Sequence, residues 1–371
     1  MKTVAVLLLA LSCRMTTLCA QQQITLLFAG DLMQHKEQLT AARTADGTYD
    51  YTPCFAAVRR QISSADLAIA NLETTFGGAP YTGYPAFCSP DEYLFAIRDA
   101  GFDVLLTANN HCLDRGKRGM ERTIRMLDSL HIPYAGTYPT DEARALRYPL
   151  FLVKKGFRIA LLNYTYGTNG IRPVPPNQVN YIDRKTMLKD IRTARTWNPD
   201  VIIACMHWGN EYQSLPNTEQ RELADWLLQQ GVTHVIGSHP HVIQPIELRT
   251  DSTDSVANVV NRHAVVYSLG NFISNMSRTN TDGGLLFTMT LQKDTVGRST
   301  PRTYLKHCGY NLVWTARPAL TREKNFRLCP VDSLSASTLP SAARARQTGF
   351  VNNVRQLLRR YNKGVEELLP D

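Results

Sequence analysis

The sequence predicts an α/β protein, because short apolar runs alternate with helix-like stretches along most of the chain. The runs are four to six residues long and rich in aliphatic residues, as expected for strands buried on both faces of a sheet. They cover residues 24–29, 67–70, 104–108, 159–163, 201–205, 233–236 and 264–267. Helical patterns lie between them, over residues 90–100, 118–130 and 218–230, and a further strand-like stretch covers residues 131–135.

The character of the sequence changes after residue 275. Residues 283–291 and 310–314 predict antiparallel strands, and residues 343–369 predict a basic amphipathic helix that packs on the core. Earlier in the chain, residues 167–180 are rich in glycine, proline and asparagine and follow a predicted strand. We expect this segment to form a loop at the rim of a site, or a lid over it.

The composition indicates a packed globular protein with a basic surface. Of the 371 residues, 43% are hydrophobic and 20% are charged, which excludes an intrinsically disordered chain. The formal net charge is +9, and it becomes +7 (39 basic and 32 acidic residues) without Lys2 and Arg14. Such a surface favours an anionic substrate or envelope polymer, although a general contribution to solubility is the simpler explanation. The arginines and lysines are scattered and match no nucleic-acid-binding motif, so we expect no nucleic-acid partner.

The N-terminus predicts export. Lys2 precedes an apolar run over residues 4–11, and residues 1–20 together have the organisation of a signal peptide. The run is too short to span a bilayer, and no later run in the sequence approaches the roughly 18 residues that a spanning helix needs. Cleavage at the end of the signal would release the protein into the periplasm or cell envelope. One alternative is a loose lipobox at residues 10–13, which would make Cys13 an acylated N-terminus; another is a short membrane anchor or a first core strand.

Six cysteines follow the predicted signal peptide, in a compartment that permits disulfides. Two pairs are close in sequence and are candidates for disulfides, namely Cys54 with Cys88 and Cys308 with Cys329. Cys112 and Cys205 adjoin the polar motifs described below, and we expect them to be small buried thiols rather than nucleophiles.

Polar side chains follow six of the predicted strands at the point where each strand ends. These residues are Asp31, Asn71 with Glu73, Asn110 with His111, His207, His239 with His241, and Asn271. In open α/β sheets, binding sites form beyond the carboxyl ends of the strands, so segments far apart in sequence bring their side chains to one edge. Six such strand ends in order indicate one shared site.

The pair His239 and His241 is the strongest local indication of a metal. In an extended segment, side chains two residues apart lie on the same side, so two imidazoles can bind one ion or two adjacent ions. Taken singly, His207 could be a structural histidine, and the carboxylates and Asn110 could serve helix caps and turns. Taken together, these side chains offer mixed oxygen and nitrogen ligands suited to one or two divalent ions of Mn, Fe, Zn or Mg.

These motifs resemble the bacterial capsule synthesis protein CapA family, which is associated with poly-γ-glutamate. The residues that carry the resemblance occur in family order over residues 24–275, about two thirds of the chain. They are Gly30-Asp31-Leu32-Met33, Asn71-Leu72-Glu73, Ala108-Asn109-Asn110-His111 with Asp114 and Gly116, His207-Trp208-Gly209 with Glu211-Tyr212, Gly237-Ser238-His239-Pro240-His241 with Gln244 and Glu247, and Ser268-Leu269-Gly270-Asn271-Phe272.

The CapA family is in turn similar to calcineurin-like metallophosphoesterases, and this resemblance implies a four-layer α/β/β/α sandwich. It also implies a division of the metal ligands. Asp31 and His241 would bind one metal, and Glu73 would occupy the position of the bridging aspartate. The other metal would be bound by Asn110, His207 and His239.

The resemblance also implies catalytic residues. These are His111, as the acid or charge-stabilising group near the leaving group, with Asn110 and His207. Two departures from the metallophosphoesterase pattern weaken the analogy. The first motif of those enzymes is Asp-x-His, whereas Met33 holds the third position here, and Gln34 and His35 are displaced by one and two residues. Glu73 is also one methylene longer than the aspartate that it would replace, so a site with a single ion is an open alternative.

Further polar and aromatic residues adjoin the predicted ligands and could orient them or contact a substrate. They are Asn71, Trp208, Glu211, Tyr212, Gln244, Glu247 and Asn271. For Glu211, Gln244 and Glu247, surface or helix-terminal hydrogen bonding is the alternative. Trp208 and Tyr212 could line a substrate cleft or pack in the core.

The predicted organisation is a signal peptide over residues 1–20, a CapA-like metallophosphoesterase-fold domain over residues 21–335 and a helical extension over residues 336–371. The resemblance implies a role in capsule or poly-γ-glutamate-type polymer biosynthesis, as a metal-dependent hydrolase or transferase acting on an anionic envelope polymer or γ-glutamyl peptide. The alternatives are a metal-dependent phosphoesterase, and a non-catalytic protein that binds polymer or assists membrane-bound capsule synthase components.

Overall fold

The structure of the chain is a computed structural model that describes residues 22–254, 259–294, 301–332 and 337–368. The predicted signal peptide and Cys13 lie outside these residues. Within them, no helix combines the length and the apolar character that are needed to cross a membrane.

The larger of the two main sheets has nine strands. They are β1 (Gln22–Leu32), β2 (Leu67–Leu72), β3 (Val104–Leu106), β4 (Tyr134–Ala135), β13 (Asn271–Ile273), β14 (Gly283–Asp294), β15 (Arg302–Ala316), β16 (Arg327–Pro330) and β17 (Glu366–Glu367). Their order is β16-β15-β14-β1-β2-β3-β4, with β13 paired to β1 and β17 paired to β15. The strands β1 to β4 run parallel, whereas β14 is antiparallel to β1 and to β15.

The second sheet has six strands. They are β6 (Leu150–Lys154), β7 (Phe157–Thr165), β9 (Val201–His207), β10 (His234–Ser238), β11 (Ile246–Asp254) and β12 (Val259–Val266), in the order β11-β12-β10-β9-β7-β6. The four central strands β7, β9, β10 and β12 are parallel. A separate two-stranded sheet pairs β5 (Thr137–Tyr138) with β8 (Gln178–Val179).

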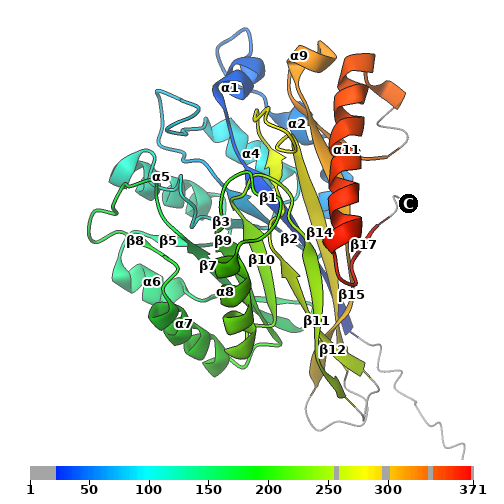
Figure 1. Ribbon diagram of the computed structural model, residues 1–371. Coiled ribbons are helices and arrows are strands. Elements are labelled where there is room, and N and C mark those ends of the chain that lie inside the picture. Colours follow the sequence, from blue (N-terminus) through cyan, green and yellow to red (C-terminus); the bar gives the residue numbers. More distant parts are fainter. Residues whose placement is uncertain (1–21, 255–258, 295–300, 333–336, 369–371) are drawn as a thin grey trace, which may run out of the picture.

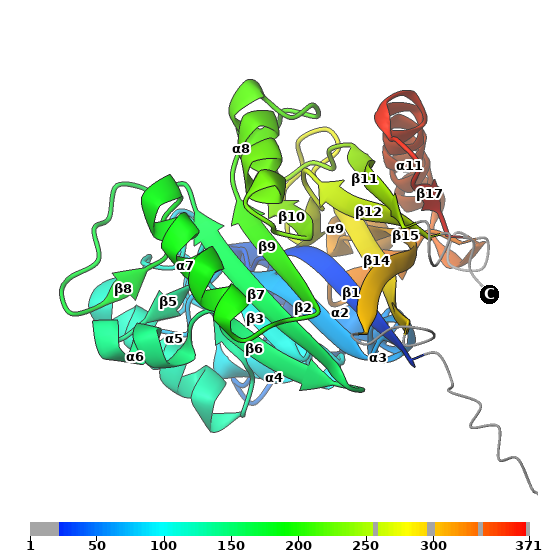
Figure 2. The ribbon, with the colours of Figure 1, turned by 90° about the horizontal axis from the view of Figure 1, so that it is seen from below.

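Helices cover the outer faces of the two main sheets (Figures 1 and 2). The six-stranded sheet is covered by α7 (Arg184–Thr196) and α8 (Thr218–Gln229), and the nine-stranded sheet by α4 (Asp91–Asp99) and α5 (Gly116–Ser129). The sheets pack on each other, with β1 against β10 and β4 against β7. The predicted α/β class and the four-layer α/β/β/α arrangement are therefore confirmed. The remaining labelled helices are α1 (Lys36–Ala42), α2 (Thr52–Phe55), α3 (Arg59–Ser63), α6 (Asp141–Arg147), α9 (Pro318–Thr321) and α11 (Ser341–Tyr361).

The apolar runs of the sequence form the central strands and lie between the layers. Every residue of β2 and of β9 is buried, as expected for strands that are covered on both faces. The segment 167–180 is a loop as predicted, apart from the short strand β8. Because buried strands run directly into the polar residues that follow them, the core fixes the positions from which those residues project.

The C-terminal helix is shorter than the sequence pattern predicts. The predicted helix covered residues 343–369, but α11 ends at Tyr361 because Asn362 is extended and its side chain accepts a hydrogen bond from the Ile246 N–H at 2.8 Å. Gly364 then has a φ of +70°, which excludes a helix, and β17 pairs with β15. α11 contacts β15 and α9, and the division of the chain at residue 335 stays a prediction.

Neither predicted disulfide is present in the structure. All six cysteines of the described residues are free and buried. Cys54 donates a hydrogen bond to an asparagine side chain, whereas Cys88 donates to a backbone carbonyl near its own loop. Cys308 lies in β15 opposite a β14 residue, and Cys329 lies in β16 opposite Trp314, six residues further along β15. The cysteines of each predicted pair are therefore near in sequence but are not bonded in the structure. The other two, Cys112 and Cys205, are buried as predicted.

The burial of His234 in β10 predicts that the stability of the fold depends on pH. His234 is fully buried, and its Nδ1 accepts a hydrogen bond from the Ala264 N–H at 3.1 Å. Burial, and next the nearby His263 ring at 6.4 Å, lower the pKa of His234 to about 3. Because an unfolded chain binds this proton near pH 6.5 and the folded chain does not, acidification favours unfolding.

We therefore expect His234→Asn, which keeps an acceptor for Ala264, to flatten the pH dependence of stability. Between about pH 7.5 and about pH 5, the wild type should lose ~2 kcal/mol more unfolding free energy than this variant. Urea unfolding at both pH values measures the difference. The exposed His307 of β15 provides the control, since His307→Asn should follow the wild type. Equal losses in the wild type and His234→Asn would contradict the prediction.

Candidate metal centre

The candidate site lies where strands of both sheets end. In the nine-stranded sheet, Asp31 of β1 is in register with Asn71 of β2, and Glu73 follows β2 directly. In the facing sheet, β9 ends at His207, which is in register with the last residue of β10, just before His239. All five side chains are buried. The carboxyl ends of strands from two sheets thus meet at one place, as the sequence predicts.

The side chain of Asn71 holds two carboxylates side by side. Its Nδ2 donates to Asp31 Oδ1 at 2.7 Å and to Glu73 Oε2 at 3.0 Å. Its Oδ1 accepts from Asn109 Nδ2 at 3.2 Å, which fixes the orientation of the amide. The other two carboxylate oxygens, Asp31 Oδ2 and Glu73 Oε1, are buried without a hydrogen-bond partner. The amide therefore satisfies one oxygen of each acid and leaves the other free.

Two buried carboxylates this close repel each other unless positive charge lies beside them. Burial, and after it the charge of Asp31, raise the pKa of Glu73 well above its usual value. Among the described residues, neither acid forms an ion pair with a lysine or arginine, and their basic neighbours are His207 and His241. A divalent cation would supply the missing charge.

His207 and Asn110 converge from opposite sheets. His207 Nε2 lies 2.7 Å from Asn110 Oδ1 and 4.0 Å from Glu73 Oε1. Burial, followed by the neighbouring histidines, lowers the pKa of His207 well below its usual value. The ring is therefore neutral at pH 7, which is the form that can bind a metal ion. Both residues occupy positions from which they could reach the same ion.

The segment that carries His239 and His241 is a turn rather than the extended segment expected from the sequence. Both residues have positive φ angles, +100° and +58°, which are costly for residues with a side chain. His241 Nδ1 lies 3.0 Å from Asn271 Oδ1 and 3.2 Å from Asp31 Oδ2, so its Nδ1–H is engaged and Nε2 is left as the acceptor. Burial lowers the pKa of His239 to about 3, and its Nδ1 has no hydrogen-bond partner.

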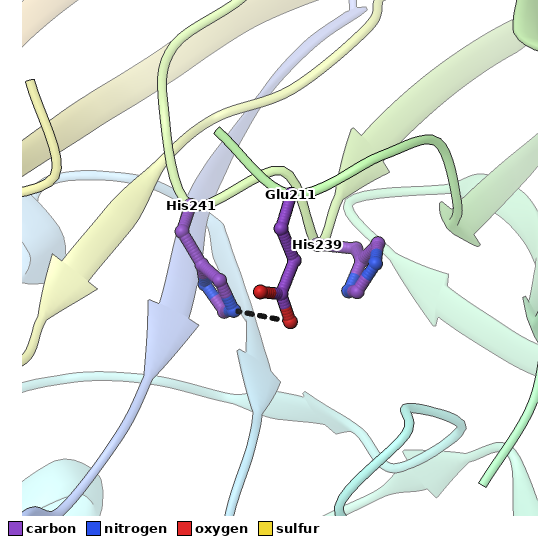
Figure 3. Close-up of side chains that lie close together, drawn as sticks. All are labelled: Glu211, His239 and His241. Atoms are coloured by element: carbon purple, nitrogen blue, oxygen red, sulfur yellow. Dashed lines mark ion pairs between the residues drawn. The ribbon is translucent and has the colours of Figure 1, made fainter. Parts of the chain in front are cut away.

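Glu211 lies between the two histidines of this turn, at the solvent side of the site (Figure 3). Its Oε1 is 4.0 Å from His241 Nε2, and its side chain is 39% exposed. Glu211, His239 and His241 form one of two groups whose ligand atoms are close enough to hold a metal ion. The Tyr212 N–H donates to Pro240 O at 2.8 Å and so fastens the Glu211 segment to the histidine turn. The sequence predicts that Glu211 orients ligands or forms surface hydrogen bonds, whereas its position is that of a potential ligand.

The second such group is Asp31, Glu73 and His207, and it is fully buried. Glu73 Oε1 faces both groups, because it lies 4.0 Å from His207 Nε2 and 3.8 Å from His241 Nε2. The resemblance implies a bridging role for Glu73, and these two distances are compatible with that prediction. Three residues of these groups, Asp31, Glu73 and His239, each carry a buried side-chain atom that forms no hydrogen bond. Carboxylate oxygens and neutral imidazole nitrogens are suitable ligands for Mn, Fe or Zn, so the residues present fit one or two divalent ions.

His111 stands beside the ligands and is paired with an acid. Its Nδ1 lies 2.7 Å from Asp114 Oδ2, which also accepts the Phe87 N–H at 2.7 Å. The Phe87 ring packs edge-on against the imidazole, with ring centroids 4.6 Å apart. The His111 N–H donates to Asn109 Oδ1, and Asn109 also holds Asn71. Asp114 belonged to the sequence motif but had no assigned role; the structure shows that it fixes the His111 ring.

Two residues at the site were missed by sequence reasoning. Tyr166 follows β7, its N–H donates to His207 O, and its ring packs on His239 with centroids 4.4 Å apart. Burial, and next the charge of Glu211, raise the pKa of Tyr166 to about 12. Asn169 Oδ1 accepts from Asn110 Nδ2 at 3.2 Å, so the predicted rim loop contacts a candidate ligand. Tyr166 directly follows β7, but the predicted strand ended at residue 163, two residues before the end of β7, so the sequence pattern did not mark Tyr166 as a strand-end residue.

Three of the predicted accessory residues lie away from the ligands. Trp208 is buried, and its Nε1–H donates to a backbone carbonyl, so it packs in the core. Gln244 donates to Gln213 O and therefore supports the loop after Glu211 instead of touching an imidazole. Glu247 of β11 is held by Lys363 at 3.0 Å and by an arginine of its own strand. The structure thus places Glu247 outside the site.

The predicted gap at Met33 persists. Met33 is fully buried, and its carbonyl accepts hydrogen bonds from Gln38 and Tyr93. His35 Nδ1 accepts from the Asn275 N–H at 3.2 Å, and neither Met33 nor His35 belongs to the two ligand groups. Glu211 offers an oxygen ligand on the His241 side of the site, where the absence of a histidine at position 33 predicts that the first metal lacks a ligand.

Known proteins share this sequence pattern. "PGA biosynthesis protein CapA" of Bacillus subtilis (strain 168) is 29% identical over 295 residues, covering 73% of this chain and 68% of that protein. "Capsule biosynthesis protein CapA" of Bacillus anthracis is 28% identical over 201 residues, covering 53% of this chain and 46% of that protein. The chain therefore spans between about half and two thirds of the length of these relatives.

Among solved structures, the NAD nucleotidase of Haemophilus influenzae superposes with a TM-score of 0.45 at 10% identity, covering 91% of this chain and 61% of that one. The family model described as "Bacterial capsule synthesis protein PGA_cap" matches residues 25–276, which include every candidate ligand. Because this match covers more than half of the 371 residues, the chain belongs to the bacterial capsule synthesis protein PGA_cap family.

Proposed function

We propose that this protein is a metal-dependent hydrolase or transferase that acts on an anionic polymer or γ-glutamyl peptide of the cell envelope during capsule biosynthesis. The names of the curated relatives support the biosynthetic context, and the proposed site supports a chemical step. Export to the periplasm or envelope, with or without a lipid anchor at Cys13, is part of the proposal. Membrane-bound capsule synthase components are the partners that we expect.

One observation carries the proposal: buried ligand atoms from both sheets converge without hydrogen-bond partners. Asp31 Oδ2, Glu73 Oε1 and His239 Nδ1 are all inaccessible to solvent and form no hydrogen bond, and Asp31 Oδ2 has only His241 Nδ1 beside it at 3.2 Å. Leaving a buried polar atom without a hydrogen bond costs roughly 1–3 kcal/mol. A site built only for structure would satisfy these atoms with hydrogen bonds from the protein. Bound cations satisfy them instead, and so explain why the fold tolerates the cost.

The residues of the site have three roles in the proposed reaction: they bind metal, orient the ligands and donate a proton. Asp31, Glu73, Asn110, His207, His239 and His241 would hold the metal, with Glu211 at the solvent side. A divalent ion there would supply positive charge that stabilises an oxyanion and promotes ionisation of water. Asn71 orients both buried acids, and Asn271 orients His241. His111, held by Asp114, would donate a proton to the leaving group from its free nitrogen.

A substrate panel tests the proposal directly. We expect the purified chain, loaded with Mn, Zn or Fe, to cleave or transfer γ-glutamyl oligomers or another anionic envelope polymer, and His239→Ala to be inactive at equal concentration. Phosphoesters and muropeptides complete the panel. Turnover of phosphoesters alone would favour the phosphoesterase alternative. If none of the substrates turned over with any of the ions, the protein would instead be a polymer-binding or synthase-assisting component.

A further inference from the structure

The C-terminal helix α11 lies close to a segment that leads away from the metal centre. This segment, which we call the β13–β14 segment, comprises residues 274–282 and begins three residues after Asn271. α11 contacts β15 and packs Phe350 against the start of β14 (Figure 1). A Cβ on Gly283 would lie 2.6 Å from the Phe350 ring, so glycine at this position lets the helix approach closely. α11 and most of the β13–β14 segment lie outside residues 25–276, which match the family model.

Side chains of α11 hold the β13–β14 segment at three points. Arg346 Nε donates a hydrogen bond to Asp282 Oδ2 at 2.7 Å, and Arg346 Nη2 donates to the Ser277 carbonyl at 3.0 Å. Two turns further along the helix, Asn353 Nδ2 donates to Asn280 Oδ1 at 3.0 Å. The helix therefore contacts the segment both near its beginning and at its end.

Asp282 is a buried carboxylate that depends on Arg346. Its Oδ2 also accepts a hydrogen bond from Trp314 Nε1 at 3.3 Å, whereas its Oδ1 is buried and forms no hydrogen bond. Burial lowers the pKa of Arg317, and the charge of Asp282 opposes that shift, but Arg317 donates its own hydrogen bond to a backbone carbonyl. Among the described residues, the ion pair of Asp282 is formed with Arg346. Loss of this guanidinium would leave the buried carboxylate without its charge-assisted hydrogen bond, which favours a shift of the segment.

The residue before Asp282 holds the amide that orients His241. The Thr281 carbonyl accepts a hydrogen bond from Asn271 Nδ2 at 2.8 Å, and Asn271 Oδ1 lies 3.0 Å from His241 Nδ1. All four residues are buried. Because the amide nitrogen is engaged by the Thr281 carbonyl, the amide oxygen faces the imidazole, which must carry a proton on Nδ1. His241 Nε2 is then the nitrogen that is left to bind a metal ion.

We propose that Arg346 of α11 is a positioning residue for the metal centre. Arg346 holds Asp282 in place, and with it the neighbouring Thr281 carbonyl. That carbonyl fixes the Asn271 amide, which in turn orients His241 for metal binding through Nε2. The inference rests on the proposed function, because it takes His241 as a metal ligand. It gives α11 a role in the site, in addition to its packing on the core.

The affinity of the full chain for Mn²⁺, measured by competition with a chelator, tests the proposal without any measurement of activity. We expect Arg346→Met, which keeps most of the aliphatic stem, to weaken Mn²⁺ binding about tenfold, as changes to groups that orient a ligand do. Arg355→Met is the matched control on the same helix. Arg355 forms its ion pair with Glu367 of β17, also at 2.7 Å, so its loss should leave the affinity for Mn²⁺ unchanged. Arg346→Lys keeps a cation beside Asp282, and it should weaken binding only about threefold even if Arg346→Met fails to fold.

A measurement on the metal-free protein separates this proposal from the assignment of the ligands. With isotope-labelled histidine, long-range proton–nitrogen NMR spectra in EDTA identify the ring nitrogen of His241 that carries the proton. We expect Nδ1–H in the wild type and in Arg355→Met, and a larger share of the Nε2–H tautomer in Arg346→Met and Arg346→Lys.

Two results would overturn the proposal: a His241 spectrum that is the same in the wild type and in every Arg346 variant that folds, or an equal loss of Mn²⁺ affinity in the Arg346 and Arg355 variants. If the wild type bound no Mn²⁺, the ligand assignment of the proposed function would fail. The His241 spectrum alone would then decide whether Arg346 positions this ring.

Discussion

Replacing Glu73 with glutamine is expected to abolish divalent metal binding and, at the same time, to stabilise the metal-free protein. Glu73 Oε1 faces both groups of candidate ligands, so its loss removes a ligand from each. Burial and the neighbouring Asp31 raise the pKa of Glu73 well above its usual value, so the folded state holds this carboxyl protonated more readily than the unfolded chain does. That difference stabilises the fold at low pH and is lost as the pH rises, whereas glutamine does not titrate.

Two measurements separate these effects. Metal analysis after dialysis should find divalent ion in the wild type and almost none in Glu73→Gln or His239→Ala. Thermal unfolding in EDTA at neutral pH should give a higher melting temperature for Glu73→Gln than for the wild type. Added metal at about a hundredfold its Kd should stabilise the wild type by ~2.7 kcal/mol and leave Glu73→Gln unchanged.

A surface substitution supplies the control. Glu142→Gln on the exposed first turn of α6 should retain the metal and its stabilising effect. If Glu73→Gln bound as much metal as the wild type, the ligand assignment would fail. If it instead lost metal but was destabilised in EDTA, the account of two adjacent buried acids would be wrong.

The fold and the convergence of the ligands could be predicted because both follow from local patterns. Buried runs such as the one in β9 read as strands without reference to any other part of the chain. The residues that follow parallel strands must then meet at one edge, whatever the lengths of the connections. This explains the convergence of Asp31 and Glu73, which follow strands of one sheet. His207 ends a strand of the facing sheet, so its position also depends on how the two sheets pack.

Features that depend on contacts between distant segments could not be predicted in the same way. The position of Glu211 depends on a hydrogen bond between Tyr212 and Pro240, and the histidine turn depends on two positive φ angles. The end of α11 depends on the side chain of Asn362, which binds to the start of β11. No periodic or compositional pattern in the sequence indicates any of these contacts.

The cysteines also show that contacts between distant segments could not be predicted from the sequence. Cys308 and Cys329 are near in sequence and lie in adjacent strands, which made a disulfide a reasonable hypothesis. The register of β15 and β16 places Cys329 opposite Trp314 instead. The alternation of apolar residues can indicate that two strands pair, but the register between them is fixed by the whole sheet. Here the register of β15 and β16 keeps the two cysteines apart.

His111 is the candidate proton donor of the proposed reaction. Replacing His111 with asparagine is expected to reduce the turnover rate about 10²- to 10⁴-fold while leaving the metal content unchanged. The asparagine amide can still donate to Asp114 Oδ2, so the local hydrogen bond is kept, but no group remains where the imidazole presents its second nitrogen. Metal analysis and single-turnover kinetics on the same preparation distinguish loss of the acid from loss of the ions.

Asp114 provides a graded test of the same mechanism. The carboxylate accepts both from the His111 ring and from the Phe87 N–H, so it fixes the tautomer in which the second nitrogen of the ring faces the site. Asp114→Asn should therefore slow turnover less than His111→Asn does, because the imidazole remains present but loses the carboxylate that holds its ring. Wild-type rates in His111→Asn would assign proton donation to another residue, and Tyr166, whose ring packs on His239, would be the next candidate.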